Sequence, residues 1–545
     1  MATFPAYSGP RPLRPEPPRA SIWTPFTQRL FFWLWIAALA SNVGTWMQNV
    51  GAAWLMTTLS ASPLMVALIQ TAASLPVFLL ALPAGALADL LDRRHLLLFS
   101  QGWMLVAAGL LGLLTLAGTT TPAALLGLSF ALGMGSALNA PTWQAIVPEI
   151  ADRDNLTPAI AAFGVNFNIA RAIGPALGGI IVSLLGAGAN FLLNAASFLG
   201  VMAVLYGWKR VHNPGVLPTE RMIGAMRTGV RYVRYSPPLR AVLMRTGAFI
   251  LGASALWAVM PLIARDELGL GATGYGVLLA SFGAGAVLGG SLMPQWDRYF
   301  SRDLIVAIVT VIFAAAAAAL ALVRSVPISC AVMAAAGASW TTTMSEFNVA
   351  AQLSVPQWVR GRALSWYQIV MQGGMTLGSV AWGAFATRWG VPAALLCSAP
   401  VIGLTMLTTI RYRLATASTL TLEPRPPMPL PEVAAEVPMD RGPILVTVEY
   451  LINLKQAAEF ERAMLEWRTV RRRDGATFWG LFTDAAAPNR YLEYFLVDTW
   501  VEHLRQHERG TLADLALQAY VRSFHIGQEP PVVTHQVAAS VIQSR

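Results

Sequence analysis

The sequence predicts an all-α polytopic membrane protein with twelve transmembrane helices in two six-helix repeats, followed by a soluble ferredoxin-like α+β domain. Three observations lead to this prediction: an apolar composition, an uneven distribution of basic residues between connections, and a change of pattern near residue 443. The 545 residues are 55% hydrophobic and 12% charged, with a mean hydropathy of +0.53. Soluble domains are about a quarter charged, so most of this chain must lie where water is absent.

Apolar stretches of about 20 residues or more recur along the chain, and each can cross a ~30 Å hydrocarbon core as a helix. We expect spans at 30–58, 62–89, 95–118, 122–147, 156–184, 189–208, 239–264, 273–294, 303–323, 326–352, 363–388 and 391–410. The first 20 residues are rich in Pro and Arg and lack an apolar core, which indicates a cytoplasmic tail rather than a signal peptide. The predicted divisions are a tail (1–29), a first bundle (30–208), a loop (209–238), a second bundle (239–412), a Pro-rich linker (413–442) and a cytoplasmic α+β domain (443–545).

Basic residues set the expected orientation. One alternate set of connections, together with both tails, carries 20 Lys or Arg residues, whereas the other set carries only Arg265, Arg324 and Arg388. Basic residues stay on the cytoplasmic side, so both termini are expected there and the number of spans is expected to be even. The net charge of +10 is then explained by topology and by attraction to anionic lipid head groups, without a nucleic-acid partner.

The loop 209–238 contains a short basic amphipathic segment. Its apolar residues alternate with four arginines: Met222, Ile223, Met226, Val230 and Val233 against Arg221, Arg227, Arg231 and Arg234. This pattern favours a helix lying on the membrane surface. A calmodulin-type partner site is the alternative.

Two short segments support an internal repeat. NAPTWQAIVP (139–148) closes the fourth span and NVAAQLSVP (348–356) closes the tenth, and each has Asn, then Gln, then Pro at similar spacing. Parallel six-helix repeats around a central cavity are a known transporter design, with substrate bound near the midplane. If this chain has that design, Asn139, Gln144, Asn348 and Gln352 are candidate cavity residues, and for Asn139 and Gln144 hydrogen bonding between helices is the competing explanation.

A charged motif lies between the second and third spans. GALADLLDRR (85–94) resembles the major facilitator signature at Asp89, Arg93 and Arg94, although Asp92 stands where Gly is usual. PQWDRYFSR (294–302), with Asp297 and Arg298, is a weaker copy in the second half. A carboxylate flanked by arginines can bond to helix ends in one conformation and release them in another, which makes a gate. The alternative is that these arginines determine topology only.

Further segments resemble the major facilitator branch that contains the enterobactin exporter and the transmembrane secretion effectors: NAPTWQAIVPEI, NFNIARAIGPALGG, VPQWVRGRALSWYQ and WVEHLRQHERGT. The resemblance covers essentially the whole chain. It implies a multi-pass protein of the bacterial inner membrane that exports siderophore- or drug-like small molecules. It also implies that spans one, four, seven and ten line the cavity, which adds a polar face of span one to the candidates: Asn42, Thr45, Gln48 and Asn49. Hydrogen bonding between helices is the competing explanation for that face.

Two charges lie within predicted spans. Arg171 is near the middle of span five, on a stripe with Gly164, Asn168, Pro175 and Gly178. A charge inside the membrane is costly and by default suggests function, here substrate binding or coupling. The alternative is a structural arginine bonded to backbone carbonyls. Glu346, in span ten, is a candidate proton carrier, with Arg171 as its suggested partner.

The C-terminal domain follows a different pattern. Residues 444–452 alternate like a strand, 454–472 are helical, 477–484 and 491–500 read as strands, 501–523 as a second helix, and 531–540 as a last strand. This order is that of the ferredoxin-like split unit. It resembles the antibiotic-biosynthesis-monooxygenase-like α+β barrels, which implies a homodimer contact. His503 and His507 are four residues apart, but without a third ligand we favour a solvated helix face over a metal site.

The predicted function is secondary active export by alternating access, driven by proton antiport, with a small-molecule substrate, protons and membrane lipids as partners. No cofactor or metal is expected. No nucleotide-binding loop is present, which argues against a primary pump. The C-terminal domain has no recognisable nucleophile–base pair, so we expect it to regulate or dimerise. The alternatives are an uptake symporter and a membrane-tethered enzyme or regulator that acts through that domain.

Overall fold

The structure, a computed structural model, describes residues 23–151, 155–208, 222–296, 298–414, 422–423 and 437–539. The helices that precede the C-terminal domain are α1 (Arg29–Leu59), α2 (Pro63–Leu90), α3 (Arg93–Leu116), α4 (Pro122–Ile150), α5 (Leu156–Gly207), α6 (Met222–Tyr235), α7 (Pro237–Leu262), α8 (Ala272–Trp296), α9 (Arg302–Leu322), α10 (Val326–Leu353), α11 (Arg360–Trp389), α12 (Val391–Leu404) and α13 (Leu407–Arg411). Three short helical turns accompany them: η1 (Thr24–Thr27), η3 (Ile263–Glu267) and η4 (Gln357–Val359).

Within the described residues, nine helices are long and apolar enough to cross a membrane. One of them, α5, has 52 residues and is interrupted at Gly186, where φ is 83° and ψ is 166°. A positive φ strains any residue that carries a Cβ, so glycine lets the chain turn back at this point. The helices α10 and α11 are not among the nine. The prediction of a mainly helical, multi-pass chain is therefore confirmed, whereas twelve spans stay a prediction.

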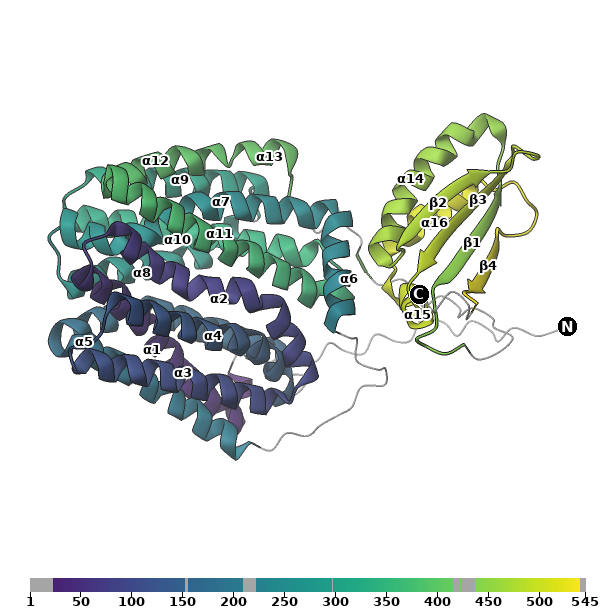
Figure 1. The fold of residues 1–545 in the computed structure, drawn as a ribbon. Helices are drawn as coiled ribbons and strands as arrows, with labels where there is room; N and C mark the ends of the chain where they lie inside the picture. The colour runs from purple at the N-terminus through teal and green to yellow at the C-terminus, as the bar shows by residue number, and fades with distance from the viewer. Residues whose placement is uncertain are drawn as a thin grey trace.

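The long helices form two groups that meet along a seam (Figure 1). Helices α1 to α5 pack on one another, as do α7 to α12, and the seam consists of α2 against α11 and α5 against α8. Gly179 of α5 and Gly276 of α8 face each other across it. A Cβ on either glycine would lie 2.7 Å from a backbone oxygen of the opposite helix. Small residues permit this close approach of two membrane helices.

Helix α6 lies at the end of the bundle that faces the C-terminal domain, which we call the domain end (Figure 1). It contacts α7 and α11 of the second group and α2 of the first. It also contacts α14 of the C-terminal domain. The segment between the two groups is therefore in contact with three parts of the molecule.

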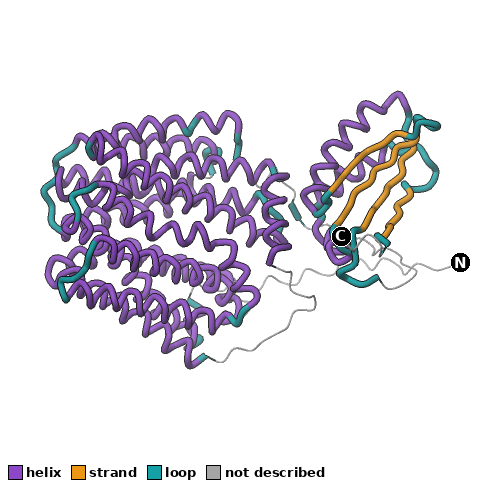
Figure 2. Tube along the Cα trace, viewed as in Figure 1, coloured by secondary structure: helices purple, strands orange, loops and turns teal. Residues whose placement is uncertain are grey.

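The C-terminal domain is built on a four-stranded antiparallel sheet of order β2-β3-β1-β4 (Figure 2). Its elements are β1 (Ile444–Leu451), η5 (Leu454–Gln456), α14 (Ala457–Asp474), β2 (Phe478–Thr483), β3 (Arg490–Val497), α15 (Trp500–Arg509), α16 (Leu512–Ser523) and β4 (Val532–Val537). Alternate residues of β1 are buried. Val448 and Tyr450 on that face pack with Phe460 and Trp467 of α14 and with Phe524.

The prediction of one helix over 501–523 is wrong, because the structure divides this segment into α15 and α16. Gly510 ends the first helix, and Thr511 caps the second in a capping box with Asp514. A reciprocal cap of this kind satisfies two backbone N–H groups and starts a new helix axis. The apolar periodicity continues through the break, which is why the pattern alone suggested a single helix.

Candidate functional site

A cavity of about 360 Å³ lies between the two groups of helices. Its walls come from α1, α2 and α5 of the first group and from α7, α8, α10 and α11 of the second. Six residues of the wall are aromatic: Trp46, Phe167, Trp257, Tyr275, Phe282 and Trp340. The other apolar residues are aliphatic or methionine. The polar contributors Asn49, Gln70 and Gln372 lie among them, together with the guanidinium of Arg171. A concave, mainly apolar pocket with a few polar groups is typical of a small-molecule site.

Arg171 bridges the two groups of helices. It lies on α5, and its Nη2 donates a hydrogen bond to the Thr341 hydroxyl on α10. The α8 backbone is close behind it, since a Cβ on Gly283 would lie 2.8 Å from the Arg171 carbonyl oxygen. None of the described residues that line this cavity is an aspartate or a glutamate. The guanidinium therefore faces an aromatic cavity without a carboxylate in its wall.

A second cavity of about 270 Å³ adjoins the first and shares Asn49, Gln70 and Gln372 with it. Its wall is more polar and comes mainly from the first group, with Thr45 and Gln48 of α1. Gln48 is buried and accepts a hydrogen bond of 3.2 Å from Asn194 Nδ2. Three of the four candidates on span one, namely Thr45, Gln48 and Asn49, thus lie at these cavities.

The remaining polar candidates do not line either cavity. Asn42 donates to Asn166 at 2.9 Å, Asn139 accepts from Gln101 at 3.1 Å, Asn348 accepts from Gln352 at 2.6 Å, and Gln144 is exposed. The first two bonds join different helices and the third joins successive turns of α10. Asn42 and Asn139 therefore connect neighbouring helices in this conformation.

The charged motif after α2 bonds to the ends of other helices. Arg93 donates to the Ala145 carbonyl at 3.1 Å and pairs with Glu149 at 2.6 Å, both on α4. Arg94 donates to the carbonyls of Leu205 and Tyr206 at 2.8 and 2.7 Å. The two arginines therefore connect the start of α3 with the domain-end termini of α4 and α5. The Asp89 side chain and Asp297 lie outside the described residues, and Arg298 is exposed beside the latter.

Glu346 does not pair with Arg171 in this arrangement. It is completely buried on α10, and Nη1 of Arg302 lies 3.8 Å from its carboxylate. A second buried charge lies near: Arg245 of α7 is 3% exposed and pairs with Asp303. The sequence interpretation missed Arg245, although its position six residues inside the predicted span 239–264 was a usable signal. Thr341, Trp257 and Trp340 were also missed, and no sequence signal distinguishes them from core residues.

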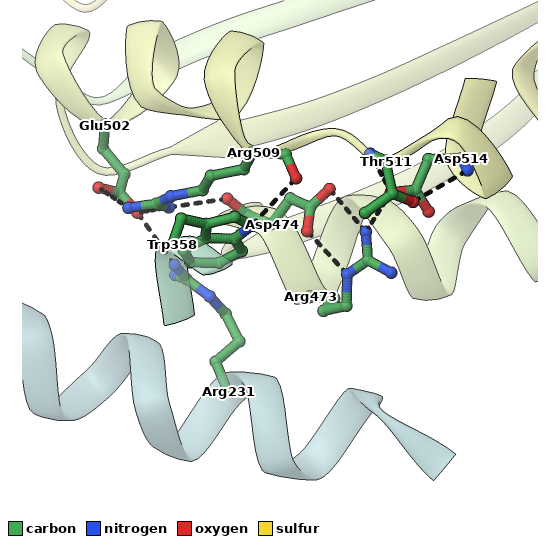
Figure 3. Close-up of polar contacts among 8 residues, drawn as sticks. All are labelled: Arg231, Trp358, Arg473, Asp474, Glu502, Arg509, Thr511 and Asp514. Atoms are coloured by element: carbon green, nitrogen blue, oxygen red, sulfur yellow. Dashed lines mark hydrogen bonds and ion pairs between the residues drawn. The ribbon is translucent and has the colours of Figure 1, made fainter. Parts of the chain in front are cut away.

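A cluster of charged and aromatic groups joins the C-terminal domain to the domain end of the bundle, and we call it the clasp (Figure 3). Its members are Arg231, Tyr232, Trp358, Arg473, Asp474, Glu502 and Arg509. Glu502 on α15 binds Arg231 of α6 at 3.0 Å and Arg509 at 2.5 Å. Burial alone would raise the pKa of Glu502, but Arg509 and Arg231 outweigh it and hold the pKa below its usual value.

Aromatic rings complete the clasp. Trp358 of η4 donates from Nε1 to the Arg509 carbonyl at 3.1 Å, and the Arg509 guanidinium lies 4.7 Å from its ring centroid. Tyr232 of α6 stacks edge-on against Trp358 at 5.8 Å. The Arg473 guanidinium lies 5.8 Å from the Tyr232 ring and also pairs with Asp474 and Asp514. The C-terminal domain thus contacts two elements of the bundle, α6 and η4.

Three histidines of the C-terminal domain, His503, His507 and His535, lie together, and His503 is buried, so the expected solvated face is wrong for His503. That side chain is 2% exposed, and its ring lies 5.0 Å from His507 and 4.9 Å from His535. The cause is β4, which brings His535 against α15. Burial, followed by the charges of His507 and His535, lowers the pKa of His503 to about 3. No group of described residues has the arrangement of a metal site.

Comparisons with known proteins agree with this geometry. The profile of the transmembrane secretion effector family matches residues 20–542. The multidrug efflux pump Tap of Mycolicibacterium fortuitum is 24% identical over 373 residues, which are 66% of this chain and 90% of the pump. The staphyloferrin A transporter of Staphylococcus aureus is 30% identical over 30% of this chain and 42% of its own length. The enterobactin exporter EntS of Salmonella typhi is 27% identical over 42% of this chain and 54% of its own length.

Solved transporter structures share the fold of the helical bundle. A bacterial homologue of the iron transporter ferroportin, in an inward-facing state, matches with a TM-score of 0.56 and 15% identity over 70% of this chain and 98% of its own. A POT family transporter in complex with 5-aminolevulinic acid matches with a TM-score of 0.59 and 13% identity over 71% of this chain and 96% of its own. At such identities the likeness concerns the fold alone.

Proposed function

The chain belongs to the transmembrane secretion effector family of the major facilitator transporters, and on that premise we propose that it exports siderophore- or drug-like small molecules by alternating access. It is an exporter-type secondary transporter and a multi-pass bacterial membrane protein. The observation that carries the proposal is the aromatic cavity with Arg171, because both groups of helices contribute its wall. A site on the seam changes its access when the two groups move apart at one end.

The test uses inside-out vesicles from cells that express the protein. Export from the cell corresponds to accumulation inside such vesicles, so a labelled substrate should accumulate when a proton gradient, acid inside, is imposed. A single proton crossing 100 mV supplies about 2.3 kcal/mol, or roughly 50-fold in concentration. Accumulation only under the opposite gradient would indicate uptake by symport and would contradict the proposal.

We propose twelve spans with both termini in the cytoplasm. Dividing α5 at Gly186 makes two spans of one helix, and α10 and α11, of 28 and 30 residues, are long enough to cross although more polar. The excess of basic residues, 20 against three, supports the orientation. Thiol labelling of cysteines introduced at Arg298 and Arg388 tests it, since the two positions should react from opposite sides.

We propose that Arg93, Arg94 and Asp89, with Asp297 and Arg298 in the second half, form the gate at the domain end. The bonds of Arg94 to the Leu205 and Tyr206 carbonyls support it, since the last turn of a helix offers unpaired acceptors to a cation. Arg93 supports it through its ion pair with Glu149 in the last turn of α4. Contacts between helix ends must be exchanged when that end opens and closes.

For coupling we propose that Glu346 carries the proton, with Arg302 as its charged neighbour. The support is complete burial of the carboxylate beside a guanidinium 3.8 Å away. Glu346→Gln should abolish accumulation driven by the proton gradient but retain exchange of labelled for unlabelled substrate. Gradient-driven accumulation by this variant would remove Glu346 from the coupling path.

For the C-terminal domain we propose a ferredoxin-like unit that dimerises through its open sheet face. The order of elements supports the fold, since β1, α14, β2, β3, the α15–α16 pair and β4 follow the split βαββαβ order. Phe478 and Phe482 stack on Tyr494 along β2 and β3 and stay exposed on that face. Exposed apolar patches mark interaction sites. Light scattering in detergent should show a dimer that Phe482→Ser reduces to a monomer.

A further inference from the structure

We infer that the cavity between the two groups of helices selects a flat aromatic molecule that carries a single anionic group. This inference rests on the proposed export through the cavity and names the chemical class of its substrate. Charge, wall chemistry and volume of the cavity each contribute to it.

The charge comes from Arg171. Its guanidinium donates to the Thr341 hydroxyl, which is neutral, and no acidic side chain occurs among the described residues of the cavity wall. The buried carboxylate of Glu346 is already beside Arg302. A guanidinium inside a membrane persists only when it is compensated. A carboxylate or similar anion on the substrate supplies that compensation, in the two-pronged geometry that a guanidinium prefers.

The wall determines the shape of the substrate. Trp257 lies 5.0 Å from Phe282 and 5.5 Å from Trp340, ring centroid to ring centroid, so these aromatic groups form a continuous surface. Aromatic rings bind the faces and edges of other rings. The buried indole N–H of Trp257 has no hydrogen-bond acceptor among the described residues.

Volume and charge together exclude other classes. The cavity of about 360 Å³ that holds Arg171 is near the lower end of the ~300–1,000 Å³ typical of drug-sized sites. The described wall of the adjoining cavity, of about 270 Å³, contains no Lys or Arg. A second or third carboxylate would be buried beside aromatic rings without a cation, which is unfavourable. A cationic molecule could lie on the tryptophan faces, but Arg171 would repel it. The class that remains is compact, aromatic and singly anionic.

Three matched probes test the inference by calorimetry on the purified full-length protein in detergent: 2-naphthoate, the neutral 2-naphthamide and the cationic 2-naphthylmethylamine. Charge-assisted hydrogen bonds are stronger than neutral ones, so naphthoate should bind roughly 10- to 100-fold more tightly than the amide. The amine should bind most weakly. Equal affinity of the wild-type protein for naphthoate and the amide, or no measurable binding of naphthoate, would by itself overturn the inference.

Variants separate charge from shape. Arg171→Gln should bring the affinity for naphthoate down to that for the amide, and Trp340→Ala should weaken both probes alike. Arg388→Gln removes an exposed arginine at the end of α11 and should change neither. An anion preference that persists in Arg171→Gln would also overturn the inference.

These measurements are independent of transport. A protein that prefers naphthoate but accumulates nothing in vesicles would contradict the proposed function alone. A protein that exports its substrate but binds amide and naphthoate equally would contradict only the inference drawn here.

Discussion

Arg93 is the residue at which the gating and topology interpretations can be separated. Its ion pair with Glu149 is partly exposed, with 26% and 22% of the two side chains accessible, so it contributes about 1 kcal/mol or less to stability. If the pair is part of a gate, Glu149→Gln should lower vesicle transport several-fold while the melting temperature stays nearly constant. If Arg93 only determines topology, transport should tolerate this change, because Glu149 contributes no basic charge to the connection between α2 and α3.

A matched control for Glu149→Gln is available at the opposite end of the bundle. Arg324 pairs with Glu267 at 2.5 Å, and Arg324→Gln removes a comparable partly exposed ion pair. This variant should transport like the wild type. Normal transport by Glu149→Gln as well would reduce the motif after α2 to a topology signal.

At the residue scale, the sequence identified which charged residues are unusual but not which residues they contact. Arg171 stood out because a guanidinium within an apolar span is costly wherever it points. Its partner Thr341 is 170 positions away and reaches it only because α5 and α10 meet at the cavity. Helical periodicity gives the face of one helix, but the rotation of that face toward a neighbour depends on packing of the whole bundle.

At the scale of elements, α6 is held by the clasp, and Glu502 is its central acceptor. Glu502→Gln would remove the carboxylate that pairs with the buried Arg509 and the partly buried Arg231. Breaking a buried pair costs roughly 3–5 kcal/mol. We expect the domain to separate from α6, with faster hydrogen exchange in α6 and α15 of the intact protein. The control is Glu449→Gln, which removes an exposed ion pair between Glu449 of β1 and Arg490 of β3. It should leave both helices protected. Unchanged protection in Glu502→Gln would show that the clasp does not hold the domain.

The histidine cluster between α15 and β4 predicts a pH dependence. Folded His503 has a pKa of about 3, whereas an unfolded histidine titrates near ~6.5. Between these values the unfolded chain binds a proton that the folded domain does not, so stability is full above about pH 6.5 and falls toward pH 3, by at most about 1.4 kcal/mol per pH unit. Hydrogen exchange of α15 and β4, corrected for intrinsic rates, should show this loss between pH 7 and pH 5.

His503→Gln should flatten that dependence, and His95→Gln, at a side chain 77% exposed in the bundle, should not. An identical slope in the wild type and His503→Gln would assign the effect to other groups. The sequence misplaced His503 because its helix face reads as polar, while its burial depends on a strand that follows 29 residues later in the chain.

At the scale of the whole molecule, cutting the chain after Arg413 distinguishes an exporter from a tethered enzyme or regulator. The cavity residues all precede this point, so the truncated protein should retain probe binding and its anion preference. If the truncated protein no longer binds the probes but the full-length Glu502→Gln variant still does, the essential site lies in the C-terminal domain. Glu502→Gln is needed beside it, because truncation also uncovers Arg231, Tyr232 and Trp358.

The whole-molecule architecture was partly predictable. Apolar stretches and basic connections report the membrane directly, since each residue interacts with lipid or water regardless of tertiary contacts. The clasp was not predictable, because Arg231 and Glu502 are 271 positions apart and each alone looks like an ordinary surface charge. The break at Gly510 was missed for the same kind of reason, since the cap that makes it depends on side-chain hydrogen bonds.

The hydrogen bond from Arg171 to Thr341 has a thermodynamic consequence. It is a contact between the two groups of helices, and an anion that takes the guanidinium competes with the hydroxyl for the same N–H donors. Occupancy of the site and the strength of this bridge are then antagonistic, and by reciprocity the arrangement that lacks the bridge must hold the anion more tightly. Binding of the substrate would weaken this hydrogen bond between the two groups of helices, and in the empty transporter the bond would be formed. Thr341→Ala should therefore raise the affinity for 2-naphthoate while leaving that for 2-naphthamide unchanged.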